Sequence, residues 1–155
     1  MERLYRLIYP VRVCLITSRH GGRDNVMAAS WVFPLSMEPP LFGVSVSEKR
    51  FSHELIRKGK SFGINLPGPD MEKAVVICGS ESGRDADKFV KAGLVKEEGA
   101  HVPLIRQCAV SIECELVKEV RSGDHVVFIG KAVNVVKRFE AKGLCQAKGE
   151  GSASP

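Results

Sequence analysis

The chain has 155 residues, of which 26% are charged and 44% are hydrophobic, and it carries a net charge of +5. This length and composition are typical of one globular domain and exclude an intrinsically disordered protein. No apolar run approaches the roughly 20 residues that a membrane-spanning helix needs. The amphipathic N-terminus has no small-residue cleavage site, so we expect a cytoplasmic protein without a signal peptide.

Cysteine spacing and charge pattern exclude further classes of site. The cysteines are odd in number and contain no C-x-x-C pair, and the four histidines form no H-x-x-H pair, so neither a disulfide framework nor a metal site is indicated. The positive charge favours anions. Lys and Arg are scattered among acidic residues, however, which disfavours nucleic acid and fits small phosphorylated ligands better.

Alternating apolar residues predict four strands in the first half of the chain. A Gly-Gly turn, a Pro-Pro pair and a helix separate them, and Ser52 is the expected N-cap of this helix. In the third strand, Gly43, Ser45 and Ser47 share one face, where their small side chains leave room beside the strand. In chain order, the predicted elements are strands at 13–18, 27–35 and 41–47, the helix at 52–60 and a strand at 61–66.

The second half combines two helices with two longer strands. Pro and Asp begin a helix at 69–79, and a second helix is predicted at 85–92. Residues 108–117 alternate between apolar and polar side chains, as expected of a half-buried strand. Residues 125–136 are apolar on both faces, so we expect this strand at the centre of a sheet. A Gly-containing hairpin at 118–124 joins the two.

Strands that follow one another without intervening helices disfavour a parallel βαβ sheet and favour a small β-barrel with helical insertions. The fold class is therefore mainly β, with about six strands and a few peripheral helices. We expect one domain at residues 1–140 and a flexible tail, rich in Gly, Ser and Ala, at 141–155.

One candidate phosphate site lies where the third strand leads into the first helix. Ser45 and Ser47 end the strand, Lys49 and Arg50 follow, and Ser52 starts the helix. A helix N-terminus offers free N–H groups and partial positive charge, and an arginine adds a forked contact. The alternative is a loop of solvated charges with an ordinary N-cap.

Two other positions are candidates for ligand contact. The small residues between Asn25 and Trp31 leave a strand edge on which a planar ring could lie, although such residues also serve packing. His125 begins a strand and could contact a second substrate, or it could hydrogen-bond a turn. No nucleophile elbow, P-loop or dinucleotide fingerprint occurs, and we assign no catalytic side chain. Chemistry on this chain would belong to a cofactor.

Three segments together resemble one family. They are NVMAASWVFPLSMEPPLFGVSVSEKRFSHELI, SGRDADKF and SGDHVVFIGKAV, within residues 9–136. In this order and spacing the chain resembles the flavin reductase-like, FMN-binding split-barrel family, which includes flavoredoxins, archaeal ferric reductases and small flavin reductase components. The resemblance implies a six-stranded Greek-key split β-barrel that forms a homodimer and binds one FMN per subunit.

The resemblance also implies roles for individual residues. His125 matches a G-D-H motif linked to nicotinamide binding. The stretch from 25 to 30 would hold the flavin ring, the Ser/Lys/Arg segment the ribityl chain and phosphate, and the D-K-F element would lie nearby. The implied cofactor-binding residues are Asn25, Val26, Met27, Ala28, Ala29, Ser30, Ser45, Val46, Ser47, Lys49, Arg50, Ser52, His53, Asp87, Lys88 and Phe89.

The implied function is an NAD(P)H-dependent flavin oxidoreductase that passes electrons to free flavin, ferric iron or a protein. The first alternative is a flavoredoxin-type FMN electron carrier without its own NAD(P)H activity, and the second is a member that binds no flavin. Family members commonly end in a segment that brings aromatic residues to the flavin. This chain has no aromatic residue after Phe139, so we expect a more open cofactor site.

Overall fold

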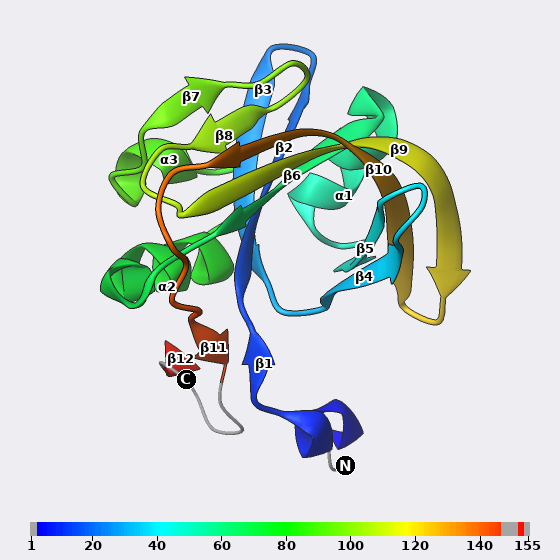
Figure 1. Cartoon of the computed structure of the whole chain (residues 1–155), viewed down its shortest axis with the longest axis horizontal. Helices are drawn as coiled ribbons and strands as arrows, with labels where there is room; N and C mark the ends of the chain where they lie inside the picture. The colour runs from blue at the N-terminus through cyan, green and yellow to red at the C-terminus, as the bar shows by residue number, and fades with distance from the viewer. Residues whose placement is uncertain (1–2, 147–151, 154–155) are drawn as a thin grey trace.

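The computed structural model describes residues 3–146 and 152–153 of the chain. A seven-stranded antiparallel sheet forms its centre, in the order β3-β2-β6-β9-β10-β5-β4 (Figure 1). The long β9–β10 hairpin lies in the middle, as predicted for the strand that begins at His125. The strands of this sheet are β2 (Cys14–His20), β3 (Arg23–Ala29), β4 (Val32–Ser36), β5 (Leu41–Ser47), β6 (Ser61–Leu66), β9 (Val110–Ser122) and β10 (His125–Lys137).

The link between β3 and β4 shows that this sheet is a barrel. The two strands are the opposite edges of the sheet, yet only Ser30 and Trp31 separate them. In a flat sheet six strand spacings would place these edges roughly 29 Å apart, whereas three residue steps of chain span at most about 11 Å. The sheet therefore curls until its edges approach, which confirms the predicted split barrel.

The strand count differs from the prediction. We expected six strands, with a single one at 27–35, because the apolar alternation continues through this stretch. In the structure it divides into β3 and β4, and the carbonyl of Trp31 accepts a hydrogen bond of 2.9 Å from the amide of Ser45 in β5. The chain thus changes its partner strand at Trp31, which the alternation does not reveal.

The three helices begin at other residues than predicted, and the second and third are also shorter. Helix α1 (Phe51–Gly59) has Arg50, not Ser52, as its N-cap, because Ser52 lies in the first turn and its hydroxyl accepts a hydrogen bond from Asn25. The helix predicted at 69–79 begins as a 3-10 turn, η2 (Pro69–Met71), before α2 (Glu72–Ser80). Only Lys88–Lys91 form α3. None of the described helices is long and apolar enough to cross a bilayer.

Alternate residues of the barrel strands pack into two separate cores. Ile16 and Met27 point into the barrel, where they meet Ile56 of α1 and the ring of Phe128. Their sequence neighbours Leu15 and Val26 point outward and pack under α2 and α3 with Val75, Phe89 and Leu94. Helix α1 therefore contributes to the inner core, and α2 and α3 cover the outer face of β2 and β3 (Figure 1).

The two ends of the described chain lie together. After η1 (Leu4–Ile8), strand β1 (Val11–Arg12) pairs with β11 (Cys145–Gln146), which pairs with β12 (Ser152–Ala153) (Figure 1). Leu144 is buried, and its carbonyl accepts a hydrogen bond of 2.8 Å from Val13. The predicted boundary at residue 140 stays a prediction, and residues 147–151 and 154–155 of the tail lie outside the described residues. A second small hairpin joins β7 (Lys96–Glu98) to β8 (Pro103–Ile105).

Candidate functional site

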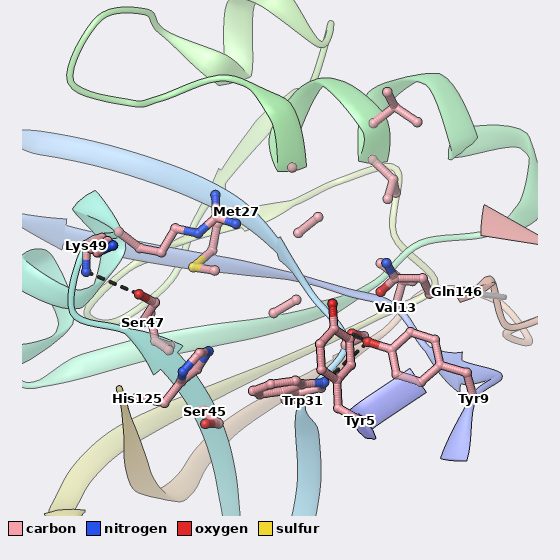
Figure 2. A pocket seen from close by; sticks show the side chains of 18 residues that line it. Tyr5, Tyr9, Val13, Met27, Trp31, Ser45, Ser47, Lys49, His125 and Gln146 are labelled. Atoms are coloured by element: carbon pink, nitrogen blue, oxygen red, sulfur yellow. Dashed lines mark hydrogen bonds between the residues drawn. The ribbon is translucent and has the colours of Figure 1, made fainter. Parts of the chain in front are cut away.

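A cavity of about 720 Å³ lies where the barrel edges approach, between the end of β3, the end of β5 and helix α2. Its volume is within the range of about 300–1,000 Å³ that is usual for small-molecule sites. Figure 2 shows Lys49 at one end of this cavity and Tyr5 and Tyr9 at the other. The site therefore has a cationic end and an aromatic end.

The edge strand β3 forms one long wall of the cavity. Residues Met27 to Ser30 line it, and opposite them Gly79 of α2 approaches Ala28 closely, since a Cβ at Gly79 would lie 3.4 Å from that of Ala28. In the sheet, β3 pairs with β2 alone among the described strands, so alternate N–H and C=O groups point away from β2. Such an edge can donate to and accept from a planar polar ring.

The face of β5 that carries Gly43, Ser45 and Ser47 is open to the cavity only at its C-terminal end. Ser45 and Ser47 line the cavity, as we expected from the room that their small side chains leave beside the strand. At Gly43, however, the ring of Phe33 fills this space, because a Cβ there would lie 2.5 Å from that ring. The usable opening is therefore limited to the last three residues of the strand.

Aromatic rings form the other end of the cavity. The Trp31 indole lies edge-on to Tyr5, with centroids 5.2 Å apart, and tilted against His125, with centroids 4.7 Å apart. Its Nε1 donates to the hydroxyl of Tyr9 over 3.3 Å, and this hydroxyl lies 3.4 Å from Oγ of Ser30. The short η1 helix and the residue that follows it thus contribute two tyrosines to the site.

His125 is oriented by its neighbour in the chain. Its Nδ1 lies 2.8 Å from Oδ1 of Asp124, and this contact lowers the pKa of the Asp124 carboxyl. Because an ionised carboxylate can only accept, Nδ1 carries the proton. The other ring nitrogen, Nε2, is therefore available to a ligand.

Beyond Lys49 and Arg50 the site continues into a second cavity of about 160 Å³. Lys88 lines it with only 4% of its surface exposed, and its Nζ donates to the carbonyl of Cys78 over 3.0 Å. Burial lowers the pKa of Lys88, and the positive charge of Arg50 lowers it further. Two like charges that face one cleft are the expected surroundings of a bound anion.

Nucleophilic and metal chemistry have little support in this part of the molecule. The five cysteines are free and four of them are buried. Burial raises the pKa of both Cys14 and Cys108 to about 12, which leaves almost no thiolate at neutral pH. Across the described residues, no group of three or more histidine, cysteine or acidic side chains is arranged to hold a metal ion.

Comparison with known proteins identifies the family. Residues 4–149 match the model of the flavin reductase like domain, which is almost the whole chain. This chain belongs to the flavin reductase-like family. An uncharacterised protein of Pyrococcus abyssi is 39% identical over 137 residues, with 88% of this chain and 80% of that protein covered. A ferric-chelate reductase (NAD(P)H) of Archaeoglobus fulgidus is 29% identical, with 95% of this chain and 86% of that protein covered.

Two solved structures show the same fold. One is an FMN-binding protein from Thermus thermophilus with bound 1-cyclohex-2-enone, which is 30% identical and superposes with a TM-score of 0.90 over 100% of this chain and 92% of that chain. The other is flavoredoxin from Methanosarcina acetivorans, 25% identical, with a TM-score of 0.87 over 96% of this chain and 86% of that chain. Flavin-binding proteins are therefore the structural relatives of this flavin reductase-like chain.

The structure brings most of the residues expected to bind cofactor together around the two cavities. Asn25, Ser52 and Lys88 line the second cavity only, and Met27, Lys49 and Arg50 line both. Those on the main cavity are Met27, Ala28, Ala29, Ser30, Ser45, Val46, Ser47, Lys49 and Arg50, and His125, which was expected to bind nicotinamide, lines this cavity as well. These assignments stay predictions, but their shared location agrees with a flavin site.

Four of the expected cofactor residues line neither cavity. Val26 and Phe89 are buried in the outer core. Asp87 caps α3, where its Oδ1 accepts from the amide of Val90 over 3.2 Å. The ring of His53 packs against Phe128, with centroids 5.4 Å apart. In the D-K-F element, Lys88 is therefore the one residue whose side chain reaches the site.

Sequence reasoning missed the residues that the chain ends and α2 contribute. Tyr5, Tyr9 and Gln146 come from elements too short to show periodicity, and Val75, Val76 and Gly79 come from the face of a helix that was predicted without a site. The two tyrosines in five residues were the available signal. They supply aromatic rings that the C-terminal segment lacks after Phe139.

The residues present fit a flavin that carries a phosphate. The edge of β3 matches a planar ring with alternating donors and acceptors, and the hydroxyls of Ser45 and Ser47 suit a polyol chain. Lys49, Arg50 and Lys88 supply positive charge where a phosphate would lie. Ring, chain and phosphate thus find matching groups in the order in which a flavin nucleotide presents them.

Proposed function

We propose that this chain is an NAD(P)H-dependent flavin oxidoreductase with FMN as its cofactor. The observation that carries the proposal is that His125 lies on the wall of the cavity that the free edge of β3 also lines. The edge of β3 would hold the flavin ring, and His125 and Trp31 on the same cavity would hold a second planar ring, such as nicotinamide.

In this proposal the protein binds and orients the cofactor and the nicotinamide nucleotide. Backbone groups of Met27 to Ser30 hold the flavin ring, and Lys49 and Arg50 hold the phosphate. When bound, FMN would supply the redox chemistry, taking a hydride from the nicotinamide ring and passing two electrons on. Residues that hold both rings in one cavity would make this transfer a step between oriented partners, which is a large part of the rate gain.

Nε2 of His125 is the group that positions the second substrate. Because Nδ1 is held by Asp124, Nε2 accepts a hydrogen bond when the ring is neutral, for example from a carboxamide N–H. Trp31 packs on the same imidazole and restricts its rotation. No side chain is required to shuttle a proton. Free flavin, a ferric chelate or a redox protein would accept the electrons, and the chain would act as a homodimer.

A flavoredoxin-type electron carrier is the second candidate. The likeness to the Methanosarcina acetivorans flavoredoxin over 96% of this chain supports it. A carrier would hold FMN in the same cavity but would receive its electrons from a protein. Its His125 would then pack against Trp31 without a role in nicotinamide binding.

A steady-state assay separates the two candidates. The FMN-loaded protein is mixed with NADH or NADPH and either free flavin or a ferric chelate, and the oxidation of the nucleotide is followed. The reductase predicts catalytic turnover with at least one nucleotide. A carrier would show no turnover with either nucleotide until a protein donor is added. Absence of turnover with both NADH and NADPH would therefore contradict the proposed reductase.

A further inference from the structure

The N-terminal segment meets the wall of the main cavity through its two tyrosine rings. No residue of η1 is buried, and its aliphatic side chains, Leu4, Leu7 and Ile8, are between 56% and 77% exposed. Tyr5 and Tyr9, in contrast, are half-buried and line the cavity. Burial of apolar side chains therefore does not explain why this segment lies against the cavity, whereas the contacts of the two rings do.

The hydroxyl of Tyr9 contacts both residues that link β3 to β4. Nε1 of Trp31 donates to this hydroxyl over 3.3 Å, and Oγ of Ser30 lies 3.4 Å from it. Because an indole N–H can only donate, the oxygen of Tyr9 is the acceptor, and its own proton is free to point toward Ser30. The hydroxyl thus joins the N-terminal segment to the point at which the barrel is split.

The ring of Tyr5 packs on the same indole. The ring centroids of Tyr5 and Trp31 are 5.2 Å apart and the ring planes are 74° apart, which is the edge-to-face arrangement that aromatic pairs favour. Tyr5 in turn lies 5.7 Å from the ring of Tyr9. Figure 2 shows the indole between these tyrosines and His125. Trp31 is therefore held on the side opposite to the imidazole.

The position of the His125 imidazole depends on that of Trp31. The hydrogen bond from Nδ1 goes to Asp124, whose side chain is 97% exposed, and a contact with such an exposed carboxylate fixes a ring only weakly. The packing against the indole, with centroids 4.7 Å apart, is the second restraint on the ring. An indole that could rotate freely would leave the imidazole with the exposed contact alone.

We infer that Tyr5 and Tyr9 are positioning residues for the second substrate, because they hold Trp31, which holds the imidazole of His125. The inference rests on the proposed function, which places the nicotinamide ring against His125. Neither tyrosine has to touch the reacting atoms. The affinity for the nicotinamide nucleotide then depends on a segment that lies more than 110 residues before His125 in the chain.

The first test follows Trp31 in the flavin-free protein by NMR. It is the only tryptophan of the chain, so the single indole N–H signal reports on its contact with Tyr9. Tyr9→Phe removes the acceptor and keeps the ring, and we expect hydrogen exchange of this proton to become about three- to tenfold faster. Leu7→Ala is the matched control, because Leu7 lies between the two tyrosines, is 56% exposed and lines neither cavity.

The second test measures steady-state kinetics of the FMN-loaded protein with the nucleotide that it oxidises. We expect Tyr9→Phe and Tyr5→Leu each to raise the KM for this nucleotide about three- to tenfold with little change in kcat, as expected when binding is weakened equally in the ground state and the transition state. FMN affinity should change less than about twofold. Leu7→Ala should leave both constants unchanged, and thermal melting checks that each variant folds.

A double-mutant cycle separates positioning from direct contact with the nucleotide. If Tyr9 acts through His125, adding Tyr9→Phe to His125→Ala should raise the KM by less than about twofold more. Fully additive losses would place Tyr9 against the nucleotide itself and would overturn the inference.

Two other results would also overturn it. Unchanged indole exchange in Tyr9→Phe would show that Tyr9 does not hold Trp31, and an unchanged KM in both tyrosine variants would remove the tyrosines from the second-substrate site. A wild type that oxidises neither nucleotide would contradict the proposed function and, with it, the role in substrate binding, while faster indole exchange in Tyr9→Phe would still show that Tyr9 holds Trp31.

Discussion

The imidazole of His125 lies against the indole of Trp31, with ring centroids 4.7 Å apart and an angle of 37° between the planes. This contact joins the first residue of β10 to the link between β3 and β4, so that His125 is held at the split of the barrel. The free Nε2 therefore has a fixed position on the cavity wall.

His125→Ala is expected to raise the KM for the nicotinamide nucleotide about tenfold, since one positioned hydrogen bond to a substrate contributes about 0.5–1.5 kcal/mol and ring packing adds to it. FMN binding should change less than twofold. Steady-state kinetics with flavin titrations measure both quantities. Asp124→Asn, which keeps a hydrogen-bonding partner for Nδ1, should have a smaller effect. Equal losses in FMN and nucleotide binding would remove His125 from the second-substrate site.

Arg50→Ala is expected to weaken FMN roughly 10- to 100-fold, because a hydrogen bond to a charged group contributes about 1.5–3 kcal/mol. Riboflavin lacks the phosphate and should bind the variant about as well as it binds the wild type. Fluorescence titration with the two ligands makes the comparison within one variant. If riboflavin lost as much affinity as FMN, Arg50 would not lie at the phosphate.

Lys88 should make the stability of the flavin-free protein depend on pH. Burial lowers its pKa in the folded state, so between that pKa and the ordinary value the unfolded chain binds more protons. The free energy of unfolding therefore rises with pH across this window, and Lys88→Met should flatten the rise. Urea unfolding at neutral and alkaline pH measures the slope. An unchanged slope in Lys88→Met would assign the effect to another group.

The buried carboxylate of Glu113 should be essential for stability. It is 0% exposed and accepts hydrogen bonds from the amides of Ala100, His101 and Val102 and from Nδ2 of Asn134. Glu113→Gln places an amide N–H against these donors, so we expect a loss of about 2–3 kcal/mol in urea unfolding. Glu115→Gln, an exposed control on the same strand, should cost less than about 1 kcal/mol.

The stabilisation of the fold by the Glu113 carboxylate should be lost at acidic pH. Burial by itself would raise the pKa of Glu113, but the three backbone amides and Asn134 together bring the pKa below its usual value. A lowered pKa in the folded state means that the stabilisation is present above the unfolded pKa of about 4.3 and is lost as the pH falls through the folded pKa. The difference between wild type and Glu113→Gln should shrink in that range.

Local pattern predicted the barrel strands because each is long enough to show alternation with one face buried. The strands at 41–47 and 61–66 match β5 and β6 residue for residue. The break at Ser30 and Trp31 was missed because the alternation runs through it and the change of partner depends on contacts with β5. The terminal strands β1 and β11 have two residues each, too few for any period.

The candidate site also contains residues that the sequence could predict and residues that it could not. Segments that lie together in the chain, such as Ser45 to Arg50, could be assigned because one strand end and one helix start carry them. Tyr5, Tyr9 and Gln146 could not, since the pairing of β1 with β11 brings these residues, which are far apart in the sequence, to one cavity.

Anaerobic single-turnover reduction tests the proposed reductase most directly. The protein is loaded with FMN, and the visible spectrum is recorded while NADH, and separately NADPH, is added. We predict that one of the two bleaches the bound-flavin band rapidly, and that His125→Ala requires a higher nucleotide concentration for the same rate. A bound-flavin band that stays oxidised with both nucleotides would contradict the reductase and favour the carrier.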